Sequence, residues 1–423
     1  MAELQKQVEA LSATTDSETR RLLEELRKEV DALSREIETL RSGVPEKKPE
    51  TTVEPVAGLG PAAARVYRAE RGVSLGGYGE AIYRNFAAHR QDGSPSGADD
   101  RVDLARAVFY FGYKFDAHFL FNSEIEYEHA VTASDKSGEV EVEFAYLDYR
   151  HARPFNLRAG LLLVPMGIVN ELHEPPVFLG VLRPDIEELL IPSTWREIGL
   201  GLYGDAGPVS YRLYLVNGLS SEGFAATGIR EGRQEGSLAL ARNWAATGRA
   251  DWTSIPGAVL GISFFTGDSG QGRHSPDGAS FSARTTLVDL HGEWRWRGVD
   301  LRALWVDSRI SDAAQVDRAN GLTGNESVGS RQRGWYVQAG YDVLTWKSVR
   351  SSLTPFLRYE EYDTQASVPQ GFARNPENDV NLWTIGAVFK PIANIAVKAD
   401  WQRRRNAAST GVNQFNVGIG WLF

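Results

Sequence analysis

The chain has no cysteine and no long apolar run, and each absence excludes a class of protein. Without cysteine, neither a disulfide scaffold nor a thiolate metal site is possible. The longest apolar run, 159–169, contains Pro165 and falls short of the roughly 20 residues that a membrane helix needs. Any membrane span must therefore be made of strands, in which lipid-facing and lumen-facing residues alternate. The low mean hydropathy of −0.32 agrees with such alternation.

The chain also has no excess of basic residues and no pair of histidines spaced as in a metal site on a helix. The net charge is −9, which argues against nucleic acid or an anionic surface as a partner. The 7 histidines are scattered, and no two have the spacing His-x3-His. We therefore expect no enzyme, no catalytic residue, no metal site and no cofactor. Glu124, Glu126 and Glu128 share one strand face and could bind a cation, but we favour a solvated wall.

Among the features that are present, the first is a helical repeat over residues 3–41. Apolar residues recur three and four positions apart, at Leu23, Leu26, Val30, Leu33, Ile37 and Leu40. One helix alone cannot bury so narrow a stripe, so the pattern predicts a self-associating coiled coil over 1–41. Val30 and Ile37 alternate with leucine, which by itself favours two helices. A surface helix packed on its own domain is the alternative.

The next stretch is rich in proline and charge and reads SGVPEKKPETTVEPVAGLGP over 42–61. This composition is typical of a semi-rigid spacer and not of a packed connection. We therefore divide the chain into a coiled-coil helix at 1–41, a linker at 42–71 and a β domain at 72–423.

From residue 72 onward the apolar period changes to two, which indicates strands. Each candidate is long enough to cross a bilayer at a tilt. The sixteen candidates are 73–86, 101–113, 117–131, 139–152, 155–165, 194–205, 208–218, 238–253, 258–267, 283–296, 299–309, 332–344, 352–364, 379–390, 394–406 and 412–423.

The connections between these candidates alternate between short and long. Short ones such as 153–154 and 297–298 follow every second strand, and long ones such as 166–193 follow the others. A soluble β-sandwich has no reason to sort its loops in this way, whereas outer-membrane barrels have short periplasmic turns and long outer loops. We therefore expect a transmembrane barrel of sixteen antiparallel strands in the outer membrane of a Gram-negative-type bacterium. The N-terminus would then be periplasmic, and outer-membrane lipid and lipopolysaccharide would surround the barrel.

The last candidate strand places only apolar residues on one face, among them Phe415, Trp421 and the terminal Phe423. An exposed edge strand of this kind would be an aggregation hazard in water. The pattern resembles the signal that barrel-assembly machineries read at the end of outer-membrane proteins.

Charged residues alternate with apolar ones along several strands. A lipid-facing Arg or Lys at the bilayer midplane costs about 2–4 kcal/mol, so these charges should line the lumen. The basic candidates for the lumen wall are Arg158, Arg212, Arg295, Arg358, Lys398 and Arg404.

The longest loop, 166–193, contains many apolar residues and prolines for an outer loop. Burial of these residues predicts that the loop folds inward and narrows the pore, whereas a cap over the barrel or a subunit interface is the alternative. The predicted constriction residues are Glu171, His173, Glu174, Arg183, Asp185, Glu187 and Glu188.

Sixteen strands, a long loop after the fifth and a terminal Phe resemble the general porin superfamily. The run Pro192-Ser193-x-Trp195-x-Glu197-x-Gly199-x-Gly201, with Asn217-Gly218 after it, is similar to the phosphate-selective porin O/P family. The added N-terminal coiled coil resembles the DcaP-like branch of trimeric porins with a periplasmic helical stalk. This resemblance implies a homotrimer and passive uptake of small, often anionic solutes. A departure from the family is that no lysine-rich cluster or continuous arginine ladder is present.

The expected function is therefore passive diffusion of small hydrophilic solutes through a narrowed lumen. The alternative is a structural tether in which the coiled coil binds peptidoglycan or a periplasmic protein. A third alternative is a scaffold within an outer-membrane complex, whose lumen would be plugged.

Overall fold

The computed structural model describes residues 24, 28 and 58–423. The predicted coiled coil at 1–41 and the linker up to residue 57 lie outside this part, apart from residues 24 and 28. Both features therefore stay predictions.

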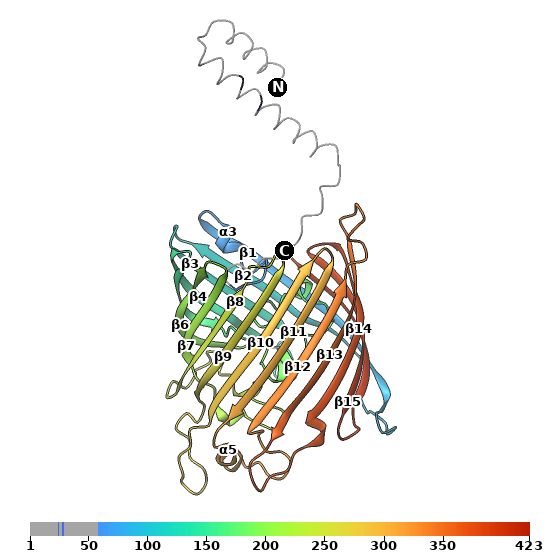
Figure 1. Ribbon diagram of the computed structural model, residues 1–423. Helices are drawn as coiled ribbons and strands as arrows, with labels where there is room; N and C mark the ends of the chain where they lie inside the picture. The colour runs from blue at the N-terminus through green and yellow to red at the C-terminus, as the bar shows by residue number, and fades with distance from the viewer. Residues whose placement is uncertain (1–23, 25–27, 29–57) are drawn as a thin grey trace. The chain divides into compact units, whose positions relative to one another are not determined.

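Residues 72–422 form one closed barrel of sixteen strands in which every neighbouring pair is antiparallel (Figure 1). All sixteen strands expected from the sequence are present. They are β1 (Gly72–Arg90), β2 (Arg101–Lys114), β3 (Phe119–Glu128), β4 (Val140–Ala152), β5 (Phe155–Leu163), β6 (Arg196–Ala206), β7 (Val209–Asn217), β8 (Trp244–Trp252), β9 (Ala258–Asp268), β10 (Arg284–Trp296), β11 (Val299–Ile310), β12 (Arg331–Tyr341), β13 (Ser352–Ser367), β14 (Asp379–Ile392), β15 (Ile395–Asn406) and β16 (Val412–Leu422).

The barrel closes between its first and last strands. Tyr78 pairs with Leu422 and Phe86 with Gln414. The backbones of Gly77 and Phe423 add two reciprocal hydrogen bonds of 3.0 and 2.9 Å. The apolar face predicted for the end of the chain points outward, with Phe415 and Phe423 exposed. Closure leaves no strand edge unpaired, as a membrane environment requires.

The connections sort by end of the barrel as expected. The turns at 153–154, 207–208 and 297–298 lie at the end where the chain terminates, and the long loops lie at the other (Figure 1). The loop at 311–330, with helix α5 (Ala313–Asn320), is one of the long ones.

Side chains alternate between the two faces of the wall. On β10, Leu290 is 49 % exposed on the outer face, whereas the neighbouring Asp289 and His291 are buried on the inner face. This alternation gives the barrel an apolar outer band and a polar, charged interior, as in an outer-membrane barrel.

The helices of the described residues are short. They are α3 (Arg65–Arg68), α4 (Ile186–Leu189) and α5, with the 3-10 turns η1 (Pro175–Val177), η2 (Ser221–Gly223), η3 (Arg230–Gly232) and η4 (Pro376–Asn378). Within the described part of the chain, no helix has the length and apolarity to cross a membrane.

Candidate functional site

The chain between β5 and β6, residues 164–195, is the most extensively buried connection of the barrel. Within this β5–β6 segment only Leu182, Asp185, Glu188 and Leu189 are not buried. A surface loop would leave most of its backbone in water. The burial therefore requires that wall side chains satisfy the backbone groups of the segment.

Asn170 holds the two ends of the β5–β6 segment together. Its Nδ2 donates to the carbonyl oxygens of Val164 and Trp195, at 2.7 and 3.1 Å. The backbone N–H of Trp195 donates to Asn170 Oδ1 at 2.8 Å. The indole of Trp195 is buried against the ring of Phe265 on β9. The segment thus leaves and rejoins the wall at a fixed point.

Glu187 anchors the first half of the segment from within. Its Oε2 accepts from the N–H groups of Ile168 and Val169, both at 2.6 Å, and its Oε1 accepts from the Tyr336 hydroxyl of β12 at 2.6 Å. The neighbouring Gly167 donates to Asp289 of β10 at 3.1 Å. This half is therefore fixed to the wall through backbone groups.

The middle of the segment, residues 176–180, is held by basic side chains that donate to its carbonyl oxygens. Arg302 of β11 donates to Val177 at 2.8 Å, and Lys390 of β14 donates to Pro176 at 2.6 Å. Lys398 of β15 donates to Gly180 at 2.8 Å.

Residues 181–186 of the segment are attached to β13 and β15 through acidic side chains of both the wall and the segment. Asp400 of β15 accepts from the Val181 N–H at 2.6 Å. Glu360 of β13 accepts from the Ile186 N–H at 3.4 Å and pairs with the buried Arg358 at 2.7 Å. Asp185 accepts from Tyr362 at 2.9 Å and also pairs with Arg404.

Glu171 joins a second network on β7, β8 and β10. Arg212 is 3.1 Å from Glu171 and 2.8 Å from Asp251, and Arg249 is 2.7 Å from Asp251. The buried His291 lies between Asp251 and Asp289, at 3.0 and 2.6 Å. Carboxylates compensate the arginines, as buried charges require.

The remaining candidates of the constriction and the wall lie in different surroundings. Arg183 is buried, whereas Glu188 is exposed. Arg295 is partly exposed and pairs with Glu293 and Asp300, at 2.5 and 3.4 Å. These residues do not gather at one point with the others.

Arg158 lies at the centre of a cluster of tyrosines. Its guanidinium donates to Asp148 at 2.9 Å and stacks over the rings of Tyr146 and Tyr203, at 4.3 and 4.6 Å from their centroids. Tyr203 also donates to Asp148, at 2.8 Å. Stacking and ion pairing together hold this cation in place.

Residues 58–71, which we expected to be part of the linker, pack against the barrel interior. Glu174 of the β5–β6 segment accepts from the N–H groups of Ala62 and Ala63, at 2.9 and 3.0 Å. Asn122 of β3 donates to the Ala63 carbonyl at 2.9 Å, and the Tyr67 hydroxyl donates to Asp148. This contact was not predicted from the sequence, although a signal for it was present in the run of apolar residues at Leu59, Ala62, Ala63, Ala64 and Val66.

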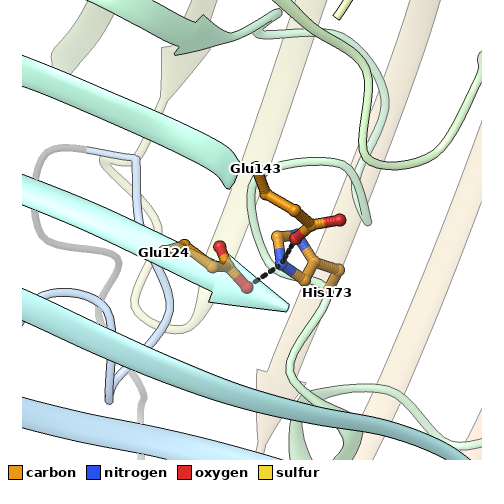
Figure 2. Close-up of side chains that lie close together, drawn as sticks. All are labelled: Glu124, Glu143 and His173. Carbon is orange, nitrogen blue, oxygen red and sulfur yellow. Dashed lines mark hydrogen bonds and ion pairs between the residues drawn. The ribbon is translucent and has the colours of Figure 1, made fainter. Parts of the chain in front are cut away.

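His173 lies between two carboxylates of neighbouring strands (Figure 2). Its Nε2 is 3.2 Å from Glu124 Oε1 of β3 and 3.2 Å from Glu143 Oε2 of β4. These residues form a group of possible metal ligands, although the sequence predicted no metal site. The sequence predicts His173 in the loop and the glutamates on the wall, but the contact between them depends on the tertiary fold.

One catalytic spacing occurs in the chain but lies in a strand. Gly72-Val73-Ser74-Leu75-Gly76 matches Gly-x-Ser-x-Gly, whose serine needs a sharp turn from strand to helix. Here all five residues pair with β2 in regular register, so no such turn is present.

The fold resembles solved outer-membrane porins. OmpF of Salmonella typhi, in a complex with daunomycin, aligns over 84 % of this chain and 98 % of its own, with 15 % identity and a TM-score of 0.55. The anion-selective porin of Comamonas acidovorans aligns over 84 % of this chain and 100 % of its own, with 13 % identity and a TM-score of 0.51. This chain is thus a porin-like β-barrel of the outer-membrane type.

No family model matches the sequence. A relative is found among the proteins of Aquifex aeolicus (strain VF5), where it is described as an uncharacterized protein. The two sequences are 39 % identical over 379 residues, which are 88 % of this chain and 84 % of the relative. The chain belongs to the same family as this Aquifex aeolicus protein.

Proposed function

We propose that the protein is an outer-membrane porin for passive diffusion of small hydrophilic solutes, with a lumen narrowed by residues 166–193. The observation that carries this proposal is the set of bonds between the β5–β6 segment and wall strands β10 to β15. The partners include Asp289 on β10 and Asp400 on β15, which are five strands apart around the barrel, whereas the segment itself starts and ends at β5 and β6. A segment that reaches all of them occupies the space that a solute would cross.

The charges along this path are mixed. Arg212, Arg302 and Arg358 each have a carboxylate partner within 3.1 Å. Paired charges largely cancel each other's field, so the structure supports small polar solutes more directly than a strong preference for anions. The reversal potential across a salt gradient reports this preference.

Planar-bilayer recording tests the proposal. We expect the full chain to give stepwise ion conductance, and a variant lacking residues 1–64 to give larger steps. That deletion removes Ala62 and Ala63, whose backbone N–H groups donate hydrogen bonds to Glu174 inside the barrel. A variant lacking residues 1–57 keeps this contact and is the matched control, with steps like those of the full chain. Folded protein without steps would contradict the porin proposal, and equal steps in both deletions would show that residues 58–64 do not narrow the lumen.

A structural tether is the second candidate. It is favoured by the burial of charges inside the barrel, because a lumen with little water is a poor path for solutes. Asp148, Arg358 and Lys398 are each no more than 2 % exposed, which leaves little water around them. Purified cell wall should then retain the full chain and release the variant that lacks residues 1–57. Retention of both would count against a tether through the N-terminal region.

The porin-like fold also supports the proposals of a homotrimer and of a periplasmic N-terminus. Light scattering of the detergent-solubilised full chain measures the number of subunits. Protease added to whole cells should leave residues 1–57 intact if they are periplasmic.

A further inference from the structure

The three side chains Glu124, Glu143 and His173 are brought together by a local irregularity of the barrel. Glu124 pairs with Phe144 and the next residue, Ile125, pairs with Val142, so Glu143 is an extra residue in β4. Such a β-bulge changes the direction of a side chain and is often found beside functional sites. Here both Glu143 and Phe144 are buried on the inner face. Figure 2 shows the Glu143 carboxylate directed at the His173 ring.

The hydrogen bond on the far side of the ring fixes the tautomer of His173. Its Nδ1 lies 2.8 Å from the carbonyl oxygen of Asn170, which can only accept. The proton of a neutral ring is therefore on Nδ1, and the Nε2 lone pair faces Glu124 and Glu143. A histidine that donates one N–H to a carbonyl and presents the other nitrogen is the usual arrangement of a metal-binding histidine.

Lone pairs of one nitrogen and two carboxylates repel each other unless a positive charge lies between them. Among residues 58–423, the ion pairs of Glu124 and Glu143 are with His173 alone. Two nearby cations form ion pairs with other carboxylates: Arg106 of β2 is 3.1 Å from Glu126, and Arg196 of β6 pairs with Glu141. The described residues donate no hydrogen bond to either carboxylate oxygen of Glu143 or to Oε2 of Glu124. Both glutamates are 0 % exposed, so bulk solvent does not compensate their charges.

The spacing of these atoms suits a metal ion. Two ligand atoms that are each about 2.1 Å from a tetrahedral zinc ion are roughly 3.4 Å apart. The Nε2 of His173 is 3.2 Å from each carboxylate oxygen, so small movements admit the ion. Two carboxylates and a neutral imidazole also balance the charge of a divalent cation. The free oxygens of both glutamates or a water molecule would supply further ligands.

We propose that Glu124, Glu143 and His173 bind a divalent transition-metal ion of the zinc type, which fastens the β5–β6 segment to β3 and β4. Imidazole and carboxylate ligands suit Zn²⁺ better than Mg²⁺ or Ca²⁺, which prefer all-oxygen sites. This proposal does not depend on conduction through the barrel, so it would still hold if the porin proposal were wrong.

Zinc content measured by mass spectrometry on the full chain tests this proposal. Because the three ligands are buried, the protein is refolded in detergent with Zn²⁺, and loosely bound metal is then removed by gel filtration. We expect about one zinc ion per chain, and X-ray absorption should show nitrogen and oxygen ligands at about 2.0–2.2 Å. If the folded protein contained no zinc, the proposal would be wrong. The positive charge between the two glutamates would then be a protonated His173.

Variants locate the ion. Glu143→Gln and His173→Asn each remove one ligand atom and should lower zinc affinity at least about tenfold. Glu231→Gln and His89→Asn, at exposed positions, are the matched controls and should bind zinc like the wild type. Equal zinc content in ligand and control variants would overturn the assignment. If the ligand variants do not fold, refolding the wild type with Mg²⁺ in place of Zn²⁺ gives a second test. Thermal stability should rise with Zn²⁺ alone, and an equal rise with both ions would contradict a transition-metal site.

Discussion

Asp148→Ala should destabilise the barrel by about 3–5 kcal/mol, because it removes the carboxylate that forms an ion pair with a buried cation. Asp148 accepts from the Arg158 guanidinium and from the hydroxyls of Tyr67 and Tyr203. Arg158 is only 4 % exposed, so water cannot replace the lost carboxylate. Equilibrium unfolding in urea, with the protein in lipid vesicles, measures the loss of free energy of unfolding.

An exposed ion pair provides the control for this variant. Asp268 pairs with Arg284 at 2.8 Å, but the Arg284 side chain is 64 % exposed. Asp268→Ala should therefore cost no more than about 1 kcal/mol. If the two variants were equally stable, the Arg158 cluster would not be the buried anchor that the structure indicates.

Leu290→Arg should destabilise the membrane-inserted barrel by about 2–4 kcal/mol. Leu290 lies in the middle of β10, is 49 % exposed and points outward, where it pairs with Ile262 and Trp305 of the adjoining strands. An arginine there faces hydrocarbon, which cannot hydrate its charge. Urea titration of folding into lipid vesicles reports this free energy.

The penalty should depend on depth in the bilayer. Leu260 also points outward, but it lies near the start of β9, close to the turn at 253–257. Leu260→Arg should cost about 0–1 kcal/mol if that position is near the interface. An unaltered stability of Leu290→Arg would contradict a lipid-facing outer surface.

The strands could be predicted because the membrane imposes a period of two on every one of them. The alternating pattern gave a wrong start for β8, which was predicted to begin at 238 and begins at Trp244. Leucine and alanine alternate over 238–241 as in a strand, but Leu238 is fully exposed in a long loop. Alternation alone cannot distinguish such a loop from a strand, because it does not report whether a residue finds a pairing partner.

The contacts of the candidate site could not be predicted from local patterns. Glu174 bonds to Ala62 and Ala63 across more than one hundred residues of sequence, and Asp400 reaches Val181 across more than two hundred. The proline-rich, charged stretch at 42–61 predicted a linker up to residue 71, because composition does not reveal that the barrel interior offers partners to residues 58–71. The inward direction of the predicted wall arginines followed from alternation, but their carboxylate partners did not.

The central claim is our proposal that the β5–β6 segment narrows the passage through the barrel, and single-channel conductance tests it most directly. Leu163 pairs with Arg196 at the ends of β5 and β6, so a short glycine-serine turn can replace residues 166–193. Heat-modifiable migration in gels would establish that this variant folds. We predict that its conductance steps are much larger than those of the full chain under the same salt. Steps of equal size in the two folded proteins would contradict the account.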